Sequence, residues 1–119
     1  MWAHKGDFGH GKVHLEKAYK IRVEVPNNDP LTVSWSETNL GNVTASGKEY
    51  EVALEWQLKA ESTRLKGDQT DEGMKNANAV GNQNIGRSLW LLGRYEEART
   101  YLRKSIEQLT EKESWAMLA

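Results

Sequence analysis

The chain has 119 residues and no cysteine, a length that allows one domain or a piece of one and a composition that excludes disulfides and thiolate metal sites. Its 16 basic and 17 acidic residues give a formal net charge of −1 and form no long run of one sign, so we expect neither nucleic acid nor a membrane surface as a partner. No apolar run approaches the roughly 20 residues that span a bilayer, and the N-terminal stretch lacks the apolar centre of a signal peptide, which predicts a cytoplasmic protein.

Start and stop signals for helices follow one another along the chain. Asp29 is a good helix N-cap, and Pro30 follows at the first helical position, where its missing N–H costs nothing. Gly67 marks the end of one helix, and Asp71 and Glu72 begin the next, because a helix N-terminus favours acidic side chains. No segment alternates long enough to indicate a strand. The sequence therefore predicts an all-α chain, with helices at about 8–25, 30–46, 48–66, 71–92, 95–108 and 111–119.

The last of these helices is predicted from a capping signal. Thr110 and Glu113 have the spacing of a capping box, in which each side chain satisfies a backbone N–H at a helix start. We therefore expect the chain to break after Gln108 and to begin a new helix at 111.

Residues 84–108 predict a helical hairpin that turns at Gly93. On its first helix Ile85 recurs at helical spacing with other apolar residues beside Gly86, and Ala98 faces them from the second helix. A small residue opposite a small residue lets two antiparallel helices approach closely, so we expect Gly86 to contact Ala98. A single hairpin cannot bury this face alone, and other parts of the chain must cover it.

The hairpin pattern repeats along the chain. Gly41 and Gly86 are 45 residues apart, and the same offset relates Ala53 to Ala98. A third copy at the N-terminus, 42 residues before the second, places Gly11 in the position of Ala53. Aromatic and small residues in fixed register indicate one repeated unit, and a hydrophobic content of 38% suits a molecule whose layers touch only their neighbours. We divide the single array over 1–119 into a partial repeat at 1–29, repeats at 30–69 and 70–110, and the start of a further or capping helix at 111–119.

Two motifs give this unit a family resemblance. Asn-x-Gly occurs at 39–41 and at 84–86, and Gly-Arg-Tyr-Glu-Glu-Ala runs over 93–98. The pattern resembles the tetratricopeptide repeat, and its lengthened spacing is similar to that of kinesin light chains and of many fungal repeat proteins. The resemblance implies an α–α superhelix, a solenoid of antiparallel helical hairpins.

The resemblance also implies where a ligand binds. In this family the inner helices of consecutive repeats line a concave groove that holds an extended peptide or a partner helix. The matching positions are Trp35, Thr38, Asn39, Asn42 and Ala45 in one repeat and Gln83, Asn84, Arg87, Trp90 and Leu91 in the next.

The chemistry of these residues suits a bound peptide. Asn39 and Asn84 each carry a donor and an acceptor on a short stem, so they can bond a peptide backbone without reading its side chains. Arg87 can hold a carboxylate, and Trp35 and Trp90 offer large rigid contact areas. The alternative is that the asparagines bond the neighbouring inner helix and the tryptophans pack between repeats.

We therefore expect a protein-interaction scaffold that binds a peptide segment of a protein partner and has neither enzymatic activity nor a cofactor. One alternative is a regulatory or sensor array within a larger multidomain protein, such as a fungal nucleotide-binding signalling protein. Another is a small metal-binding helical protein, because His10 and His14 stand four apart on one helix. No acidic third ligand accompanies the two histidines, so we expect no metal. The chain opens and ends inside a repeat without a polar capping helix, which predicts self-association through uncapped ends.

Overall fold

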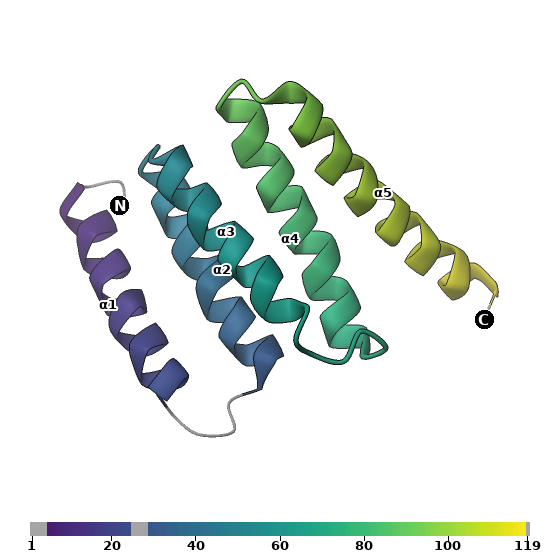
Figure 1. The fold of residues 1–119 in the computed structure, drawn as a ribbon, viewed down its shortest axis with the longest axis horizontal. Coiled ribbons are helices and arrows are strands. Elements are labelled where there is room, and N and C mark those ends of the chain that lie inside the picture. The colour runs from purple at the N-terminus through teal and green to yellow at the C-terminus, as the bar shows by residue number, and fades with distance from the viewer. Residues whose placement is uncertain (1–4, 25–28, 119) are drawn as a thin grey trace.

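The computed structural model describes the backbone of residues 5–24 and 29–118 and the side chains of residues 11–21 and 29–110. Within these ranges the chain forms α-helices and no strand, so the all-α prediction is confirmed. The helices lie in a row, each antiparallel to the one before (Figure 1). They are α1 (Lys5–Glu24), α2 (Pro30–Ser46), α3 (Tyr50–Arg64), α4 (Glu72–Leu91) and α5 (Tyr95–Leu118).

The predicted starts of two helices are confirmed by their caps. The Asp29 carboxylate accepts a hydrogen bond from the backbone N–H of Leu31 at 3.4 Å, with Pro30 at the head of α2. The Asp71 carboxylate accepts one from the N–H of Met74 at 3.0 Å at the head of α4. In both cases a side-chain oxygen satisfies an N–H group that has no partner inside its helix.

The predicted break before residue 111 is wrong, because α5 continues without interruption to Leu118. Neither glycine nor proline lies in this helix, so the capping signal at Thr110 stands without a residue that ends the preceding turns. A threonine inside a helix can bond the carbonyl four residues back, as Thr100 does with Glu96 at 3.3 Å. The stretch expected to start a further helix is therefore the last part of α5, while its side chains lie outside the described residues.

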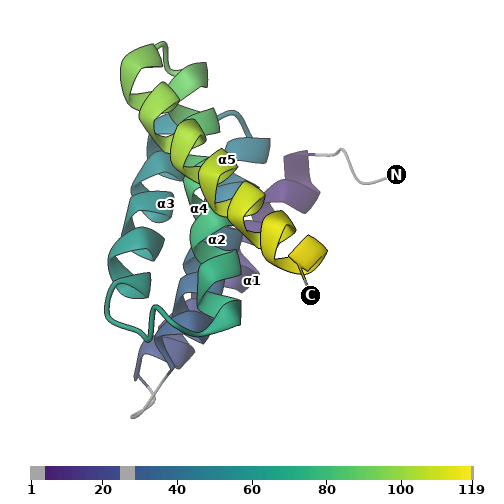
Figure 2. The same cartoon turned by 90° about the vertical axis from the view of Figure 1, so that its right-hand side faces the viewer.

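The two complete hairpins pack with equivalent residues in the core. Ala53 of α3 and Ala98 of α5, which are 45 residues apart, are both fully buried, and so are Leu40 of α2 and Ile85 of α4. The core between the hairpins gathers Leu54 of α3 with residues of α4 and α5. The α2–α3 hairpin stacks on α4 through both of its helices, and α1 packs against α2. Figure 2 shows α3 to one side of α2 and α4, which leaves these two as neighbouring inner helices.

The close approach within the α4–α5 hairpin is made differently from the prediction. A Cβ placed on Gly86 would lie 2.7 Å from Cγ of Leu102, and its three nearest neighbours are all atoms of Leu102 rather than of Ala98. At the equivalent position a Cβ on Gly41 would lie 2.9 Å from Cγ of Gln57 and 3.3 Å from the carbonyl oxygen of Ala53, so the small residue does approach the glycine in the α2–α3 hairpin. A large side chain thus covers each glycine, and Ala98 packs in the core beside it.

A buried carboxylate joins α1 to α2. Glu37 is 1% exposed, and its Oε2 accepts a hydrogen bond from the Tyr19 hydroxyl at 2.9 Å, whereas its Oε1 is buried without a hydrogen bond to any residue that the structure describes. The Tyr19 ring also packs in a T-shaped arrangement with the ring of Trp56 of α3, at a centroid distance of 5.2 Å. Because an unpaired buried carboxylate is costly, the hydrogen bond from Tyr19 to Glu37 favours this position of α1 against α2.

A buried arginine joins α3 to α4. Arg64 is 1% exposed, its Nε donates to Oδ1 of Asn78 at 2.9 Å, and its guanidinium lies against Gly81. Burial lowers the pKa of Arg64 from its ordinary value, while the nearby carboxylates of Glu61 and Glu37 raise it. A side chain at position 81 would collide with the guanidinium, which explains a glycine in the middle of α4.

Candidate groove between α2 and α4

The residues predicted to line a groove lie on α2 and α4, and most of them have accessible side chains. Thr38 is the exception, because it is buried and its Oγ1 donates to the Ser34 carbonyl at 2.8 Å. Trp35, Ala45 and Asn84 are partly buried. The exposed members are Asn39, Asn42, Gln83, Arg87, Trp90 and Leu91.

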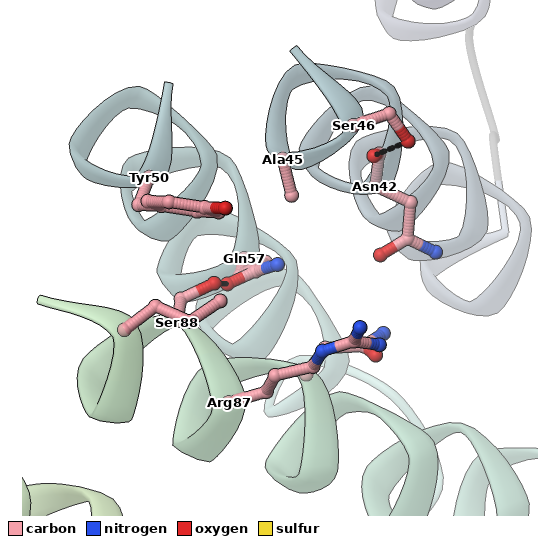
Figure 3. A pocket seen from close by; sticks show the side chains of 9 residues that line it. Asn42, Ala45, Ser46, Tyr50, Gln57, Arg87 and Ser88 are labelled. Carbon is pink, nitrogen blue, oxygen red and sulfur yellow. Dashed lines mark hydrogen bonds between the residues drawn. The ribbon is translucent and has the colours of Figure 1, made fainter. Parts of the chain in front are cut away.

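Five of these residues meet around one cavity of about 290 Å³, which opens between α2, α3 and α4 (Figure 3). The cavity brings together Asn42 and Ala45 of α2 with Asn84, Arg87 and Leu91 of α4. The other predicted residues do not line it. They are Trp35, Thr38, Asn39, Gln83 and Trp90.

Four further residues line this cavity that the sequence reasoning missed. They are Ser46, Tyr50, Gln57 and Ser88. The 45-residue register gives one indication that Gln57 is special. This polar residue occupies the position that the apolar Leu102 takes in the next hairpin. A polar residue at an otherwise apolar repeat position is buried only when it finds a partner.

The floor of the cavity is a hydrogen bond between the two hairpins. The Ser88 hydroxyl of α4 donates to Oε1 of Gln57 of α3 at 2.7 Å, and both residues are buried. Figure 3 shows this pair below Tyr50. Gln57 is 4% exposed, and its Nε2 has no hydrogen bond to another residue in the part of the chain that the structure describes.

Two other donors of the cavity have no partner among the described residues. The Nδ2 of Asn84 is buried and makes no hydrogen bond to any of them. Arg87 forms no hydrogen bond or ion pair with residues 11–21 and 29–110, and in Figure 3 it reaches from α4 toward Asn42 of α2. A buried amide without a partner costs about 1–3 kcal/mol. The cavity therefore presents N–H donors that fit a ligand rich in acceptor oxygens.

The tryptophans lie away from this cavity. Trp90 is 52% exposed, and its ring packs edge-on against Tyr95 at a centroid distance of 4.7 Å and an interplanar angle of 68°. This ring pair joins the end of α4 to the start of α5.

The alternative of a metal site receives no support from the residues that the structure describes. His14 is exposed on α1, and the side chain of His10 lies outside the described residues. Among the described side chains, no three histidine or acidic residues stand close enough to hold a metal ion. Nor does any helix within the described ranges combine the length and apolar character needed to cross a bilayer.

Comparison with known proteins gives a family match for the α4–α5 hairpin, whose helix α4 forms one wall of the cavity. Residues 80–108, which include most of α4 and the first part of α5, match the family model of the tetratricopeptide repeat. Neither the curated proteins nor the solved structures gave a match. The resemblance derived from the repeated motifs is thereby confirmed over this hairpin.

Proposed function

We propose that this tetratricopeptide-type repeat protein is a cytoplasmic, non-enzymatic interaction module that binds an extended peptide segment of a protein partner between α2 and α4. Repeats of this family generally mediate protein–protein interactions, and residues 80–108 match it. The observation that carries the peptide assignment is the buried Nδ2 of Asn84, which has no partner in the described structure and borders the cavity.

The donors around the cavity suit a peptide backbone and an acidic group. The Asn84 amide can donate to a backbone carbonyl of the segment, which repays the cost of burying Nδ2 unpaired. Arg87 carries a guanidinium without a protein partner among the described residues and can hold a carboxylate with two parallel hydrogen bonds. Asn42 supplies a second amide from the opposite helix. A segment that uses all three side chains lies across both inner helices.

A selection from displayed random linear peptides tests the proposal. Peptides that bind the wild-type chain are measured by fluorescence polarisation against Asn84→Ala, Arg87→Gln and the control Gln83→Ala, an exposed residue of α4 that does not line the cavity. Loss of one hydrogen bond to a charged or buried group predicts affinities lower by about tenfold to a hundredfold in the first two variants. Selected peptides that bind all three variants like wild type, or a selection without binders, contradict the proposal.

Self-association through the ends of the array stays a prediction. Among the described side chains, exposed apolar residues at these ends include Val13 and Ile21 on α1 and Ile106 and Leu109 on α5. Sedimentation velocity over a hundredfold range of concentration measures it. A concentration-independent monomer contradicts it.

A further inference from the structure

The cavity lies where one hairpin lacks an aromatic ring that the other possesses. In the α4–α5 hairpin, the indole of Trp90 packs edge-on against Tyr95 at 4.7 Å. The equivalent residues 45 positions earlier are Ala45 and Tyr50. Tyr50 is therefore retained, but a methyl group stands where the indole would be. Ala45 and Tyr50 both line the cavity (Figure 3).

We propose that this cavity receives a tyrosine side chain of the bound peptide, whose ring takes beside Tyr50 the position that the indole of Trp90 takes beside Tyr95. This inference rests on the proposed function and names the anchor residue of the peptide. The neighbouring backbone and any acidic group of the same segment then lie within the reach of Asn84 and Arg87.

The size and the walls of the cavity fit one aromatic ring. A volume of about 290 Å³ is at the lower limit for small-molecule sites and suits a single large side chain. Ala45, Tyr50 and Leu91 supply apolar surface. Aromatic rings prefer the edge-to-face arrangement that Trp90 and Tyr95 already adopt in this chain.

The polar floor selects tyrosine among the aromatic residues. Nε2 of the buried Gln57 and Nδ2 of Asn84 are both donors without a partner in the described structure. A phenol oxygen accepts hydrogen bonds, whereas an indole N–H only donates and a phenylalanine ring offers neither. An aromatic side chain that carries an acceptor at its far end therefore completes the floor, and tyrosine has such an acceptor on a six-membered ring, whereas phenylalanine and tryptophan have none.

Titration with single blocked amino acids tests the assignment on the wild-type chain. The probes are N-acetyl-tyrosinamide, N-acetyl-phenylalaninamide and N-acetyl-alaninamide, followed by the side-chain amide signals of Gln57 and Asn84 in ¹H–¹⁵N NMR spectra. We expect saturable shifts with the tyrosine probe and an affinity at least about tenfold higher than that of the alanine probe, from burial of the ring. The phenylalanine probe should bind about threefold or more weakly than the tyrosine probe, because it leaves the amides unpaired. Equal affinities of the tyrosine and alanine probes overturn the proposal.

A matched pair of variants places the binding in this cavity. Ala45→Trp fills the space from within and should abolish the shifts caused by the tyrosine probe, while circular dichroism shows retained helix. Gln83→Trp adds the same indole on α4 outside the cavity and should leave them unchanged. Persistent binding in Ala45→Trp overturns the assignment, and the wild-type titration decides it alone if that variant does not fold.

The outcome is separable from that of the proposed function. Selected peptides that lose affinity in Asn84→Ala and Arg87→Gln but bind Ala45→Trp normally would support the groove and overturn the tyrosine pocket. A tyrosine probe that binds and is blocked by Ala45→Trp supports the pocket even where no linear peptide is selected.

Discussion

Gly86 of α4 lies directly beneath Leu102 of α5, so that a Cβ on Gly86 would stand 2.7 Å from Cγ and 3.2 Å from the backbone N of Leu102. The same relationship joins Gly41 to Gln57 in the preceding hairpin. A glycine costs up to about 1 kcal/mol in a helix. Both hairpins accept that cost at the same position because the backbones of inner and outer helix approach there more closely than a methyl group permits.

Replacement of Gly86 tests this closure. We expect Gly86→Ala to lower the free energy of unfolding by about 1–3 kcal/mol, because the new methyl group would force Leu102 and its backbone to move. Urea denaturation followed by circular dichroism measures the change. Gly11→Ala is the matched control, because a Cβ at this helical glycine has no neighbour within 4 Å. The control should raise stability by up to about 1 kcal/mol, and a similar gain in Gly86→Ala would refute the close approach.

The turn between α2 and α3 contains a lysine in an unfavourable conformation. Lys48 has φ of 64°, whereas its equivalent in the next turn is Gly93 with φ of 81°. A left-handed conformation costs a non-glycine residue about 1–2 kcal/mol, part of which glycine loses again through entropy. We therefore expect Lys48→Gly to stabilise the chain by about 0.5–1 kcal/mol in thermal denaturation. Gly93→Ala should destabilise it, and opposite signs from those stated would contradict the assignment of this turn.

The attachment of α1 depends on the hydroxyl of Tyr19. Tyr19→Phe leaves Oε2 of the buried Glu37 without its donor, and we expect a loss of about 1–3 kcal/mol in the free energy of unfolding. Tyr95→Phe removes a hydroxyl from an exposed tyrosine that has no hydrogen bond within the described residues, so it should be nearly neutral. Equal effects of the two substitutions would show that the hydrogen bond to Glu37 contributes nothing.

Stability should fall in alkaline solution through Tyr101. Burial raises the pKa of Tyr101 above its ordinary value of 10.0. The carboxylate of Glu61, which accepts a hydrogen bond from the Tyr101 hydroxyl at 3.3 Å, raises this pKa further. Above pH 10 the unfolded chain therefore loses this proton before the folded chain does, so the stabilisation is complete below pH 10 and lost as pH rises through the folded pKa.

Comparison of wild type with Tyr101→Phe measures this contribution. The melting temperature of wild type should fall more steeply between pH 9 and pH 11 than that of Tyr101→Phe. Burial also raises the pKa of Tyr19. Tyr19 contributes the same pH dependence of stability to both proteins, so its contribution cancels from the difference. Parallel curves would mean that Tyr101 titrates normally in the folded chain.

The sequence predicted what depends on local chemistry and on periodicity. The caps at Asp29 and Asp71 are signals within one turn of a helix, and the structure confirms both. The 45-residue register pairs Ala53 with Ala98, and both are fully buried. The error at Thr110 has a local cause as well, since a capping signal describes where a helix can begin and not whether the preceding one has ended.

The contacts between neighbouring hairpins could not be predicted from the sequence. No pattern in the sequence explains Gly81, because its neighbour is the guanidinium of Arg64, a long side chain of the preceding helix. The pairing of Gln57 with Ser88 likewise depends on how two hairpins stack. Periodicity reports which face of a helix is buried, but not which side chain of the next layer it meets.

The hydrogen bond from Ser88 to Gln57 belongs to two parts of the molecule at once, since it joins the hairpins and forms the floor of the cavity. In a repeat array, cooperativity of unfolding depends on the interface between neighbours. A ligand seated on this bond touches both hairpins, and by mass action it stabilises only the state in which they are stacked. Amide hydrogen exchange of α2–α3 and of α4–α5 would then slow together on binding, so that occupancy of one small cavity couples the opening of the two hairpins.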